Sequence, residues 1–190
     1  MNETVVIAVG LSGLRPLMFD RYLGGKSTVP TEEKLYRFPD GGVYLPARNL
    51  ISFLSARHSE SAAKRFFDPK KYKAVSGALL SYVDVSPFEI PITRRGKPIM
   101  FTGKWDPDNI AVQKDVARLK DGAANPKERP VIALPWEVAF DLTLVENGEI
   151  EIGEVKRLFE LGGLALGLGT FRGVFGKFEV TQWKPKKKGK

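Results

Sequence analysis

A glycine-rich, basic segment near the C-terminus constrains the fold most strongly, because it joins a helix-like stretch to an alternating strand. Residues 161–180 contain six glycines together with Arg172 and Lys177. Glycine adopts positive φ and lets another backbone approach closely, so such a segment turns tightly or packs against a second piece of chain. Its backbone N–H groups could also wrap a sugar-phosphate chain while the two cations supply charge. The sequence therefore leaves two interpretations open, a packed connection beneath a sheet and a phosphate-binding loop.

Two common glycine-rich nucleotide-binding motifs are excluded, one by the order of elements and the other because its sequence pattern is missing. A dinucleotide-binding fingerprint runs from a strand through the glycines into a helix whose N-terminus faces the pyrophosphate. Here the helical pattern precedes the glycines and the strand follows them, and the spacing Gly167-x-Gly169-x-x-x-Gly173 differs from that fingerprint. The sequence also lacks a G-x-x-x-x-G-K-[ST] phosphate-binding loop. We therefore expect no nucleotide cofactor.

Composition narrows the available chemistry further. A chain of 190 residues with 43% hydrophobic residues suits one folded domain with a core of its own. Cysteine is absent and His58 is the single histidine, so disulfides, thiolate zinc sites and multi-histidine metal sites are excluded. No apolar stretch reaches about 18 residues, and no basic region precedes the first apolar run. We expect a cytoplasmic protein with no metal, no cofactor and no membrane contact.

The positive charge is unevenly distributed along the chain. The formal net charge is +8, and five of the lysines lie in residues 184–190, without which the charge would be +3. A terminal run of lysines is usually a solvated chain end, so we expect residues 1–183 to form one domain and residues 184–190 to be a disordered basic tail. Such a tail would add attraction to phosphates that does not depend on sequence.

Hydrophobic periodicity predicts the order β-α-β-β-α-β once two irregular stretches, about 10–42 and 94–130, are treated as insertions. This order is typical of the α+β, ferredoxin-like fold that RRM domains share. Gly162 is the expected C-terminal end of the second helix. Residues 102–130 show charge but no regular apolar pattern. The expected elements are strands at 4–9, 83–93, 131–145 and 175–183, and helices beginning near Pro46, near residue 70 and at Ile152.

Three segments together resemble the RAMP (repeat-associated mysterious protein) superfamily, and most closely the guide-RNA-binding backbone subunits of CRISPR effector complexes. Residues 44–50 are similar to that family's Y-I-P-G-S-S-L-K-G segment at the start of its first helix. Residues 118–140 are similar to its D-R-x-T-G-x-A … E-R-V-P-A-G-x-x-F segment, and residues 167–176 to its C-terminal glycine loop. The order agrees over residues 4–183, although Ala47-Arg48-Asn49 replaces Gly-Ser-Ser.

The resemblance implies an RRM-like subunit for antiviral defence that binds single-stranded RNA and associates with copies of itself or with other subunits. It implies RNA contacts in the first turn of the first helix and in segment 94–130, which would form a β-hairpin thumb. Arg172 is expected to contact phosphate or sugar, and the alternative is a salt bridge that pins the loop. Phe171 and Phe175 are expected to stack on bases, and the alternative is core packing. The residues expected to bind nucleic acid are Arg48, Arg118, Lys120, Arg129, Gly167, Gly169, Phe171, Arg172, Gly173 and Lys177.

Other functions stay open. The chain is also similar to small uncharacterised phage and prophage proteins that combine a P-L-[LM]-[FM]-x-R motif, here residues 16–21, with the same glycine loop. This similarity allows a phage-encoded single-strand binder outside CRISPR, or a phage structural or interaction protein. A RAMP-type endoribonuclease is a further alternative, in which Asp20 would position a divalent metal on phosphate or His58 would act as a general base. Asp20 is a single acidic residue in a loop and His58 has no second catalytic residue evident beside it, so binding is expected rather than catalysis.

Overall fold

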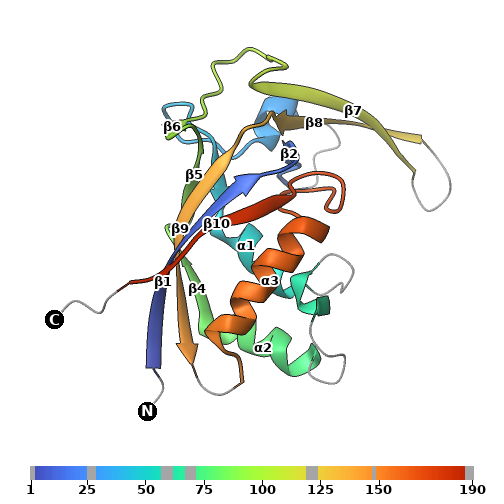
Figure 1. Cartoon of the computed structure of the whole chain (residues 1–190). Helices are drawn as coiled ribbons and strands as arrows, with labels where there is room; N and C mark the ends of the chain where they lie inside the picture. The colour runs from blue at the N-terminus through green and yellow to red at the C-terminus, as the bar shows by residue number, and fades with distance from the viewer. Residues whose placement is uncertain are drawn as a thin grey trace.

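The computed structural model describes residues 3–24, 29–56, 62–66, 72–118, 124–146 and 149–186. Within these ranges a seven-stranded antiparallel sheet has the order β10-β1-β9-β5-β3, with β4 paired to β9 and β6 paired to β5. The long strands β1 and β9 lie side by side at its centre (Figure 1). The strands of this sheet are β1 (Glu3–Gly13), β3 (Tyr44–Pro46), β4 (Val83–Ser86), β5 (Glu89–Arg94), β6 (Lys97–Pro98), β9 (Glu137–Glu146) and β10 (Phe178–Pro185).

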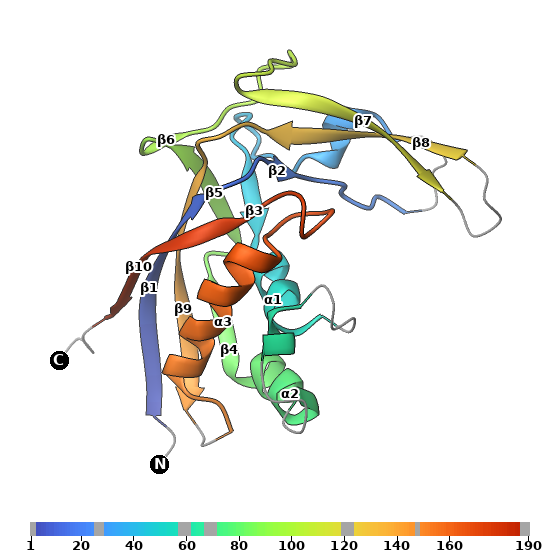
Figure 2. The same ribbon diagram turned by 45° about the vertical axis from the view of Figure 1, so that its right-hand side comes forward.

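The α-helices of the described residues cover one face of this sheet, as the two ribbon views show (Figures 1 and 2). In α1, the periodic side chains Leu50, Phe53 and Leu54 are all buried, as the sequence predicts. Phe53 packs against Phe159 and Phe178, with ring centroids 5.6 Å and 5.4 Å away, so one aromatic cluster joins two helices to β10. The helices are α1 (Ala47–Ser55), α2 (Tyr72–Tyr82) and α3 (Ile152–Ala165), and short 3-10 turns occupy η1 (Thr31–Lys34) and η3 (Ala63–Phe66).

The connectivity confirms the predicted α+β, ferredoxin-like order. One half of the core runs from β1 through α1 and α2 to β4 and β5, and the other runs from β9 through α3 to β10. The first strands of the two halves, β1 and β9, pair antiparallel over ten positions. This arrangement is that of two βαβ halves sharing one sheet.

Two strands expected from alternation are interrupted in the structure. The strand expected at 83–93 is divided at Pro87, where β4 ends and β5 begins two residues later. The strand expected at 131–145 is also divided, because Ala133 to Trp136 carry the chain from one sheet into another. Trp136 is fully buried at this turn and donates from Nε1 to the carbonyl oxygen of Arg15 at 2.8 Å. Alternation alone does not reveal such a change of direction, because the residues on both sides keep the same period.

The expectation that Gly162 ends a helix is wrong. Gly162 lies inside α3, where a Cβ atom would overlap Phe53 and Ala63, so this glycine lets α3 approach α1 closely. The helix continues to Ala165 and is followed by Gly167 at φ +87°, in the left-handed region that ends many helices.

A second sheet is formed by β2 (Leu17–Met18), β8 (Ala124–Ile132) and β7 (Ile110–Arg118). We call β7 and β8 the thumb hairpin, and both ribbon views show it extending away from the main sheet and helices (Figures 1 and 2). Its nine cross-strand pairs overturn the expectation of irregular chain for residues 110–118 and 124–130, whereas the resemblance had implied a hairpin. The outer pairs are mostly polar or contain proline, which hides the strand period from a hydrophobicity pattern.

The first and last strands of the main sheet, β1 and β10, both continue beyond the residues at which the sequence predicts their ends. β1 continues to Gly13, so the first insertion begins after that residue rather than at residue 10. Lys184 and Pro185 belong to β10, and the backbone N–H of Lys186 donates to the carbonyl oxygen of Val6 at 2.7 Å. A disordered tail beginning at residue 184 is therefore incorrect, and residues 187–190 lie outside the described ranges. In the described part of the chain, no helix is long and apolar enough to cross a membrane.

Candidate nucleic-acid interface

The glycine loop, residues 166–177, connects α3 to β10 and packs against β2 and the residue before it. The N–H of Thr170 donates to the carbonyl oxygen of Met18 at 2.9 Å, and the N–H of Gly176 donates to that of Pro16 at 2.8 Å. Gly169 has φ +75°, and a Cβ atom there would overlap the carbonyl oxygen of Met18. The inner part of the loop therefore requires glycine for packing.

Arg172 joins the glycine loop to α1. Its guanidinium donates to the carbonyl oxygen of Ser52 at 3.2 Å, to Oγ of Ser52 at 3.3 Å and to the carbonyl oxygen of Asn49 at 3.4 Å. Burial lowers the pKa of the Arg172 guanidinium from its usual value. Oδ1 of Asn49 also accepts from the N–H of Gly169 at 2.9 Å. These contacts with carbonyl and hydroxyl oxygens favour the alternative in which Arg172 pins the loop.

The outer part of the loop presents apolar side chains to solvent. Phe171 has φ +54° and is 56% exposed, and Val174 is 55% exposed. The ring of Phe175 lies 6.1 Å from that of Phe171 and is half-buried. Gly173, at φ +89°, has open space where a Cβ atom would stand. An exposed aromatic ring held by a rigid loop suits base stacking, so Phe171 stays a predicted contact.

Beside the first turn of α1, one aromatic ring and two arginines form a cluster, to which α1 contributes Arg48. Nη2 of Arg48 donates to the hydroxyl of Tyr36 at 3.2 Å, and the Arg48 guanidinium carbon lies 5.5 Å from the Tyr36 ring centroid. The guanidinium of Arg21 lies over the same ring at 5.4 Å. Both distances are within the range of cation–π attraction. We call Arg21, Tyr36 and Arg48 the arginine–tyrosine cluster.

Sequence reasoning selected Arg48 but missed Arg21 and Tyr36. Both lie in the first insertion, which lacks the apolar period used to place elements. A usable signal was present in the alternation of basic and aromatic side chains along this insertion. The residues in that pattern are Phe19, Arg21, Tyr36, Arg37 and Phe38.

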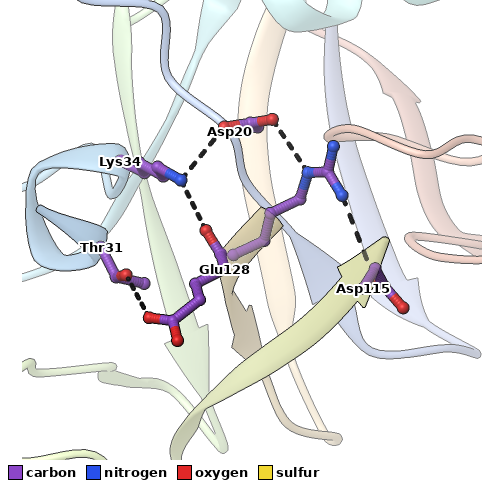
Figure 3. Close-up of polar contacts among 6 residues, drawn as sticks. Asp20, Thr31, Lys34, Asp115 and Glu128 are labelled. Carbon is purple, nitrogen blue, oxygen red and sulfur yellow. Dashed lines mark hydrogen bonds and ion pairs between the residues drawn. The ribbon is translucent and has the colours of Figure 1, made fainter. Parts of the chain in front are cut away.

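Asp20 lies between two cations at the base of the thumb hairpin. Its carboxylate is 2.8 Å from Nε of Arg129 and 3.9 Å from Nζ of Lys34 (Figure 3). Nζ of Lys34 also donates to the carbonyl oxygen of Glu128 at 2.6 Å. Asp115 approaches the same guanidinium, 4.0 Å from Nη1 of Arg129. These pairs tie β8 to the segment after β2 and to η1.

Glu128 strengthens the same connection on the outer side of β8. Its carboxylate accepts from the hydroxyl of Thr31 at 3.2 Å, as Figure 3 shows, and lies 2.9 Å from Nζ of Lys114. The hydrogen bond and charge of Lys114 lower the pKa of the Glu128 carboxyl. Because Lys114 and Glu128 are directly opposite in β7 and β8, this ion pair also supports the hairpin register.

Arg94 holds the other end of the thumb hairpin to the core. Its guanidinium donates to the carbonyl oxygens of Pro135 and Ala133, each at 2.9 Å, and to Oδ1 of Asn109 at 3.0 Å. In the sequence, Arg94 is the first residue of the segment 94–130 expected to form the thumb. The structure instead makes it a fixed link between β5 and the chain entering and leaving the hairpin.

The remaining candidates are less closely grouped. The Asp20 carboxylate is engaged with Arg129 and Lys34, and these two cations oppose the binding of a metal ion there. The described residues also contain no cluster of three His, Asp or Glu side chains suited to a metal.

Arg118 ends β7 opposite Ala124. Lys177 is half-buried, and its carbonyl oxygen accepts from the N–H of Leu14 at 2.7 Å. Lys120 and His58 lie outside the described residues.

The fold and this surface define an α+β protein with a ferredoxin-like core, a glycine loop and a projecting hairpin. No protein-family profile and no curated protein matches the sequence. The fold is similar to that of a chain in the cryo-EM structure of the type III-B Cmr-beta bound to cognate target RNA. The TM-score is 0.55 at 14% sequence identity, over 97% of this chain and 61% of the other, so this chain spans about three fifths of that chain's length.

Proposed function

We propose that this protein binds single-stranded RNA as a subunit of a ribonucleoprotein assembly. The observation that carries the proposal is the arginine–tyrosine cluster, whose Arg48 lies on the same turn of α1 that holds the glycine loop. Arg48 and Asn49 are neighbours in α1, and Asn49 accepts from Gly169 while Arg48 binds Tyr36. Cations for the phosphates and aromatic rings for the bases are the combination that single-strand binders use.

The similarity of fold supports a role in a CRISPR effector. The similar chain comes from a complex solved with its target RNA, and the match extends over almost all of this protein. The finer proposal is a guide-RNA backbone subunit whose copies follow one another along the strand. The projecting thumb hairpin supports this, because a hairpin that leaves its own core can reach a neighbouring copy or the strand bound to it (Figure 2).

The binding proposal is tested with fluorescent RNA and DNA oligonucleotides in a titration at several salt concentrations. We expect affinity for single-stranded RNA that falls steeply with salt, because phosphate contacts release counterions. Arg48→Glu is expected to weaken binding at least about tenfold, equivalent to about 1.4 kcal/mol. The matched control is Arg157→Glu, the same charge change on an exposed position of α3. Equal affinity of the two variants at low salt would contradict the assignment of the surface.

The assembly proposal is tested by light scattering with RNA of increasing length. We expect the mass of the complex to rise in steps of one protein as the RNA lengthens. One protein per strand at every length would contradict a backbone subunit and favour a solitary single-strand binder outside CRISPR. Absence of binding to any single strand would contradict the function itself and favour a structural or interaction protein.

A further inference from the structure

A pocket of about 560 Å³ lies beside the arginine–tyrosine cluster. Its volume is within the range of about 300–1,000 Å³ that is usual for small-ligand sites. Arg21 belongs to both the pocket and the cluster, because it lines the pocket and lies 5.4 Å over the ring of Tyr36. The pocket is therefore continuous with the surface to which we assign RNA binding.

The lining of this pocket combines an apolar wall with two guanidinium groups. Phe38 and Pro39 form the apolar wall, and Leu35 lies buried behind it, 1% exposed. Arg21 and Arg37 supply the positive charge, and Glu33 is the acidic residue of the lining. An apolar surface next to arginines suits a ligand with a flat ring and an anionic group, since guanidinium binds phosphate oxygens through paired hydrogen bonds.

One wall of the pocket is a tight turn that hydrogen bonds hold in place. The N–H of Phe38 donates to the carbonyl oxygen of Gly42 at 2.8 Å, and the N–H of Gly41 donates to that of Phe38 at 3.0 Å. Oδ1 of Asp40 accepts from the N–H of Gly42 at 2.8 Å, and Gly41 has φ +93°. A turn fixed in this way presents its aromatic ring with little ordering cost on binding.

The two guanidinium groups are also oriented before any ligand arrives. Arg37 lies over the ring of Phe101 at 5.3 Å, as Arg21 lies over that of Tyr36. Cation–π contacts of this kind limit the positions of a long side chain while leaving N–H donors at the edge of the guanidinium plane.

We propose that this pocket binds one nucleotide, with the base against Phe38 and Pro39 and the phosphate on Arg21 and Arg37. Its chemistry is that of a nucleoside monophosphate, either free or as one unit of a bound strand. Assignment to the strand rests on the proposed function, whereas binding of a free nucleotide does not. The pocket would then fix the position of one nucleotide relative to the strand held at α1.

The test uses calorimetric or fluorescence titration of the full chain with adenosine monophosphate, adenosine and inorganic phosphate. We expect the monophosphate to bind at least tenfold more tightly than either fragment, because only it engages both the wall and the arginines. Arg37→Glu and Phe38→Ala are each expected to weaken this binding at least tenfold. Arg157→Glu, on α3, is the matched control and is expected to bind as the wild type does. Arg37 is exposed, so its variant stays informative if Phe38→Ala lowers stability through loss of the Tyr44 ring contact.

The same variants separate failure of the pocket from failure of the proposed function. A single-stranded RNA that binds the wild type and both pocket variants equally, with no monophosphate binding, overturns the pocket and leaves the function standing. Monophosphate binding without binding of RNA at any salt concentration overturns the function and supports a site for a free nucleotide. Competition between RNA and the monophosphate, with equal losses in both variants, supports a nucleotide of the strand.

Discussion

The guanidinium of Arg172 donates to the carbonyl oxygen of Ser52 at 3.2 Å, although 120 residues separate the two along the chain. This contact closes the glycine loop onto the helix that carries Arg48. Because Asn49 accepts from Gly169 in the same place, loop and helix form one rigid surface. Mutations of Arg172 are therefore expected to affect folding as well as binding.

Replacing Arg172 with alanine is expected to lower the free energy of unfolding by about 1–3 kcal/mol, because the loop loses its side-chain bonds to α1. Urea denaturation measures the change. Arg157→Ala, at an exposed position of α3, is the control and is expected to stay within about 0.5 kcal/mol of the wild type. A stable Arg172→Ala protein with lost RNA affinity would instead place Arg172 in direct contact with the strand.

The glycines of the loop are expected to differ in their tolerance of alanine. Gly169→Ala places a Cβ atom against the carbonyl oxygen of Met18, so the variant is expected to lose stability through both overlap and positive φ. Gly173→Ala has open space at φ +89° and is expected to lose only about 1–2 kcal/mol from its conformation. Thermal melting of the two variants provides the comparison, and equal losses would contradict the packed geometry at Gly169.

The sequence predicted the core order because the apolar positions of α1 and of the main strands follow regular periods. Leu50, Phe53 and Leu54 show this clearly, since the helical spacing that selected them also buries them. The break at Trp136 could not be predicted in this way, because the strands on both sides alternate in the same manner. Its burial depends on β1, where a Cβ atom on Gly13 would overlap the indole ring.

The candidate interface was only partly predictable for a different reason. Arg48 and the glycine loop were found from local motifs, whereas Arg21 and Tyr36 meet Arg48 through tertiary contacts across the first insertion. The same limit applies to Arg129, which the sequence selected for nucleic acid and the structure pairs with Asp20. Residue type shows that a side chain carries charge, but the partner that engages the charge follows from the fold.

The pair of Asp20 and Arg129 is expected to couple the thumb hairpin to the core. A double-mutant cycle with Asp20→Asn and Arg129→Gln is expected to give a coupling free energy of about 0.5–3 kcal/mol, because the pair is partly buried and 2.8 Å apart. Denaturant unfolding of the four proteins measures it. Lys156 and Glu160, an exposed pair on α3, provide the control cycle, for which we expect about 0.3–0.5 kcal/mol. Equal coupling in the two cycles would remove the structural role assigned to Asp20.

The end of β10 is expected to matter for stability even though it is rich in lysine. A chain ending at Trp183 loses the pairing of Lys184 and Pro185 with β1, together with the bond from the N–H of Lys186 to Val6. A chain ending at Lys186 keeps these contacts, so the melting temperature is expected to be lower for the first truncation than for the second. Both truncated chains lose Lys187, Lys188 and Lys190. Each lysine that pairs with a phosphate of single-stranded RNA contributes about 0.7 to the slope of log affinity against log salt. Equal melting temperatures for the two truncations would show that residues 184–186 add no stability, and the extended β10 would then be contradicted.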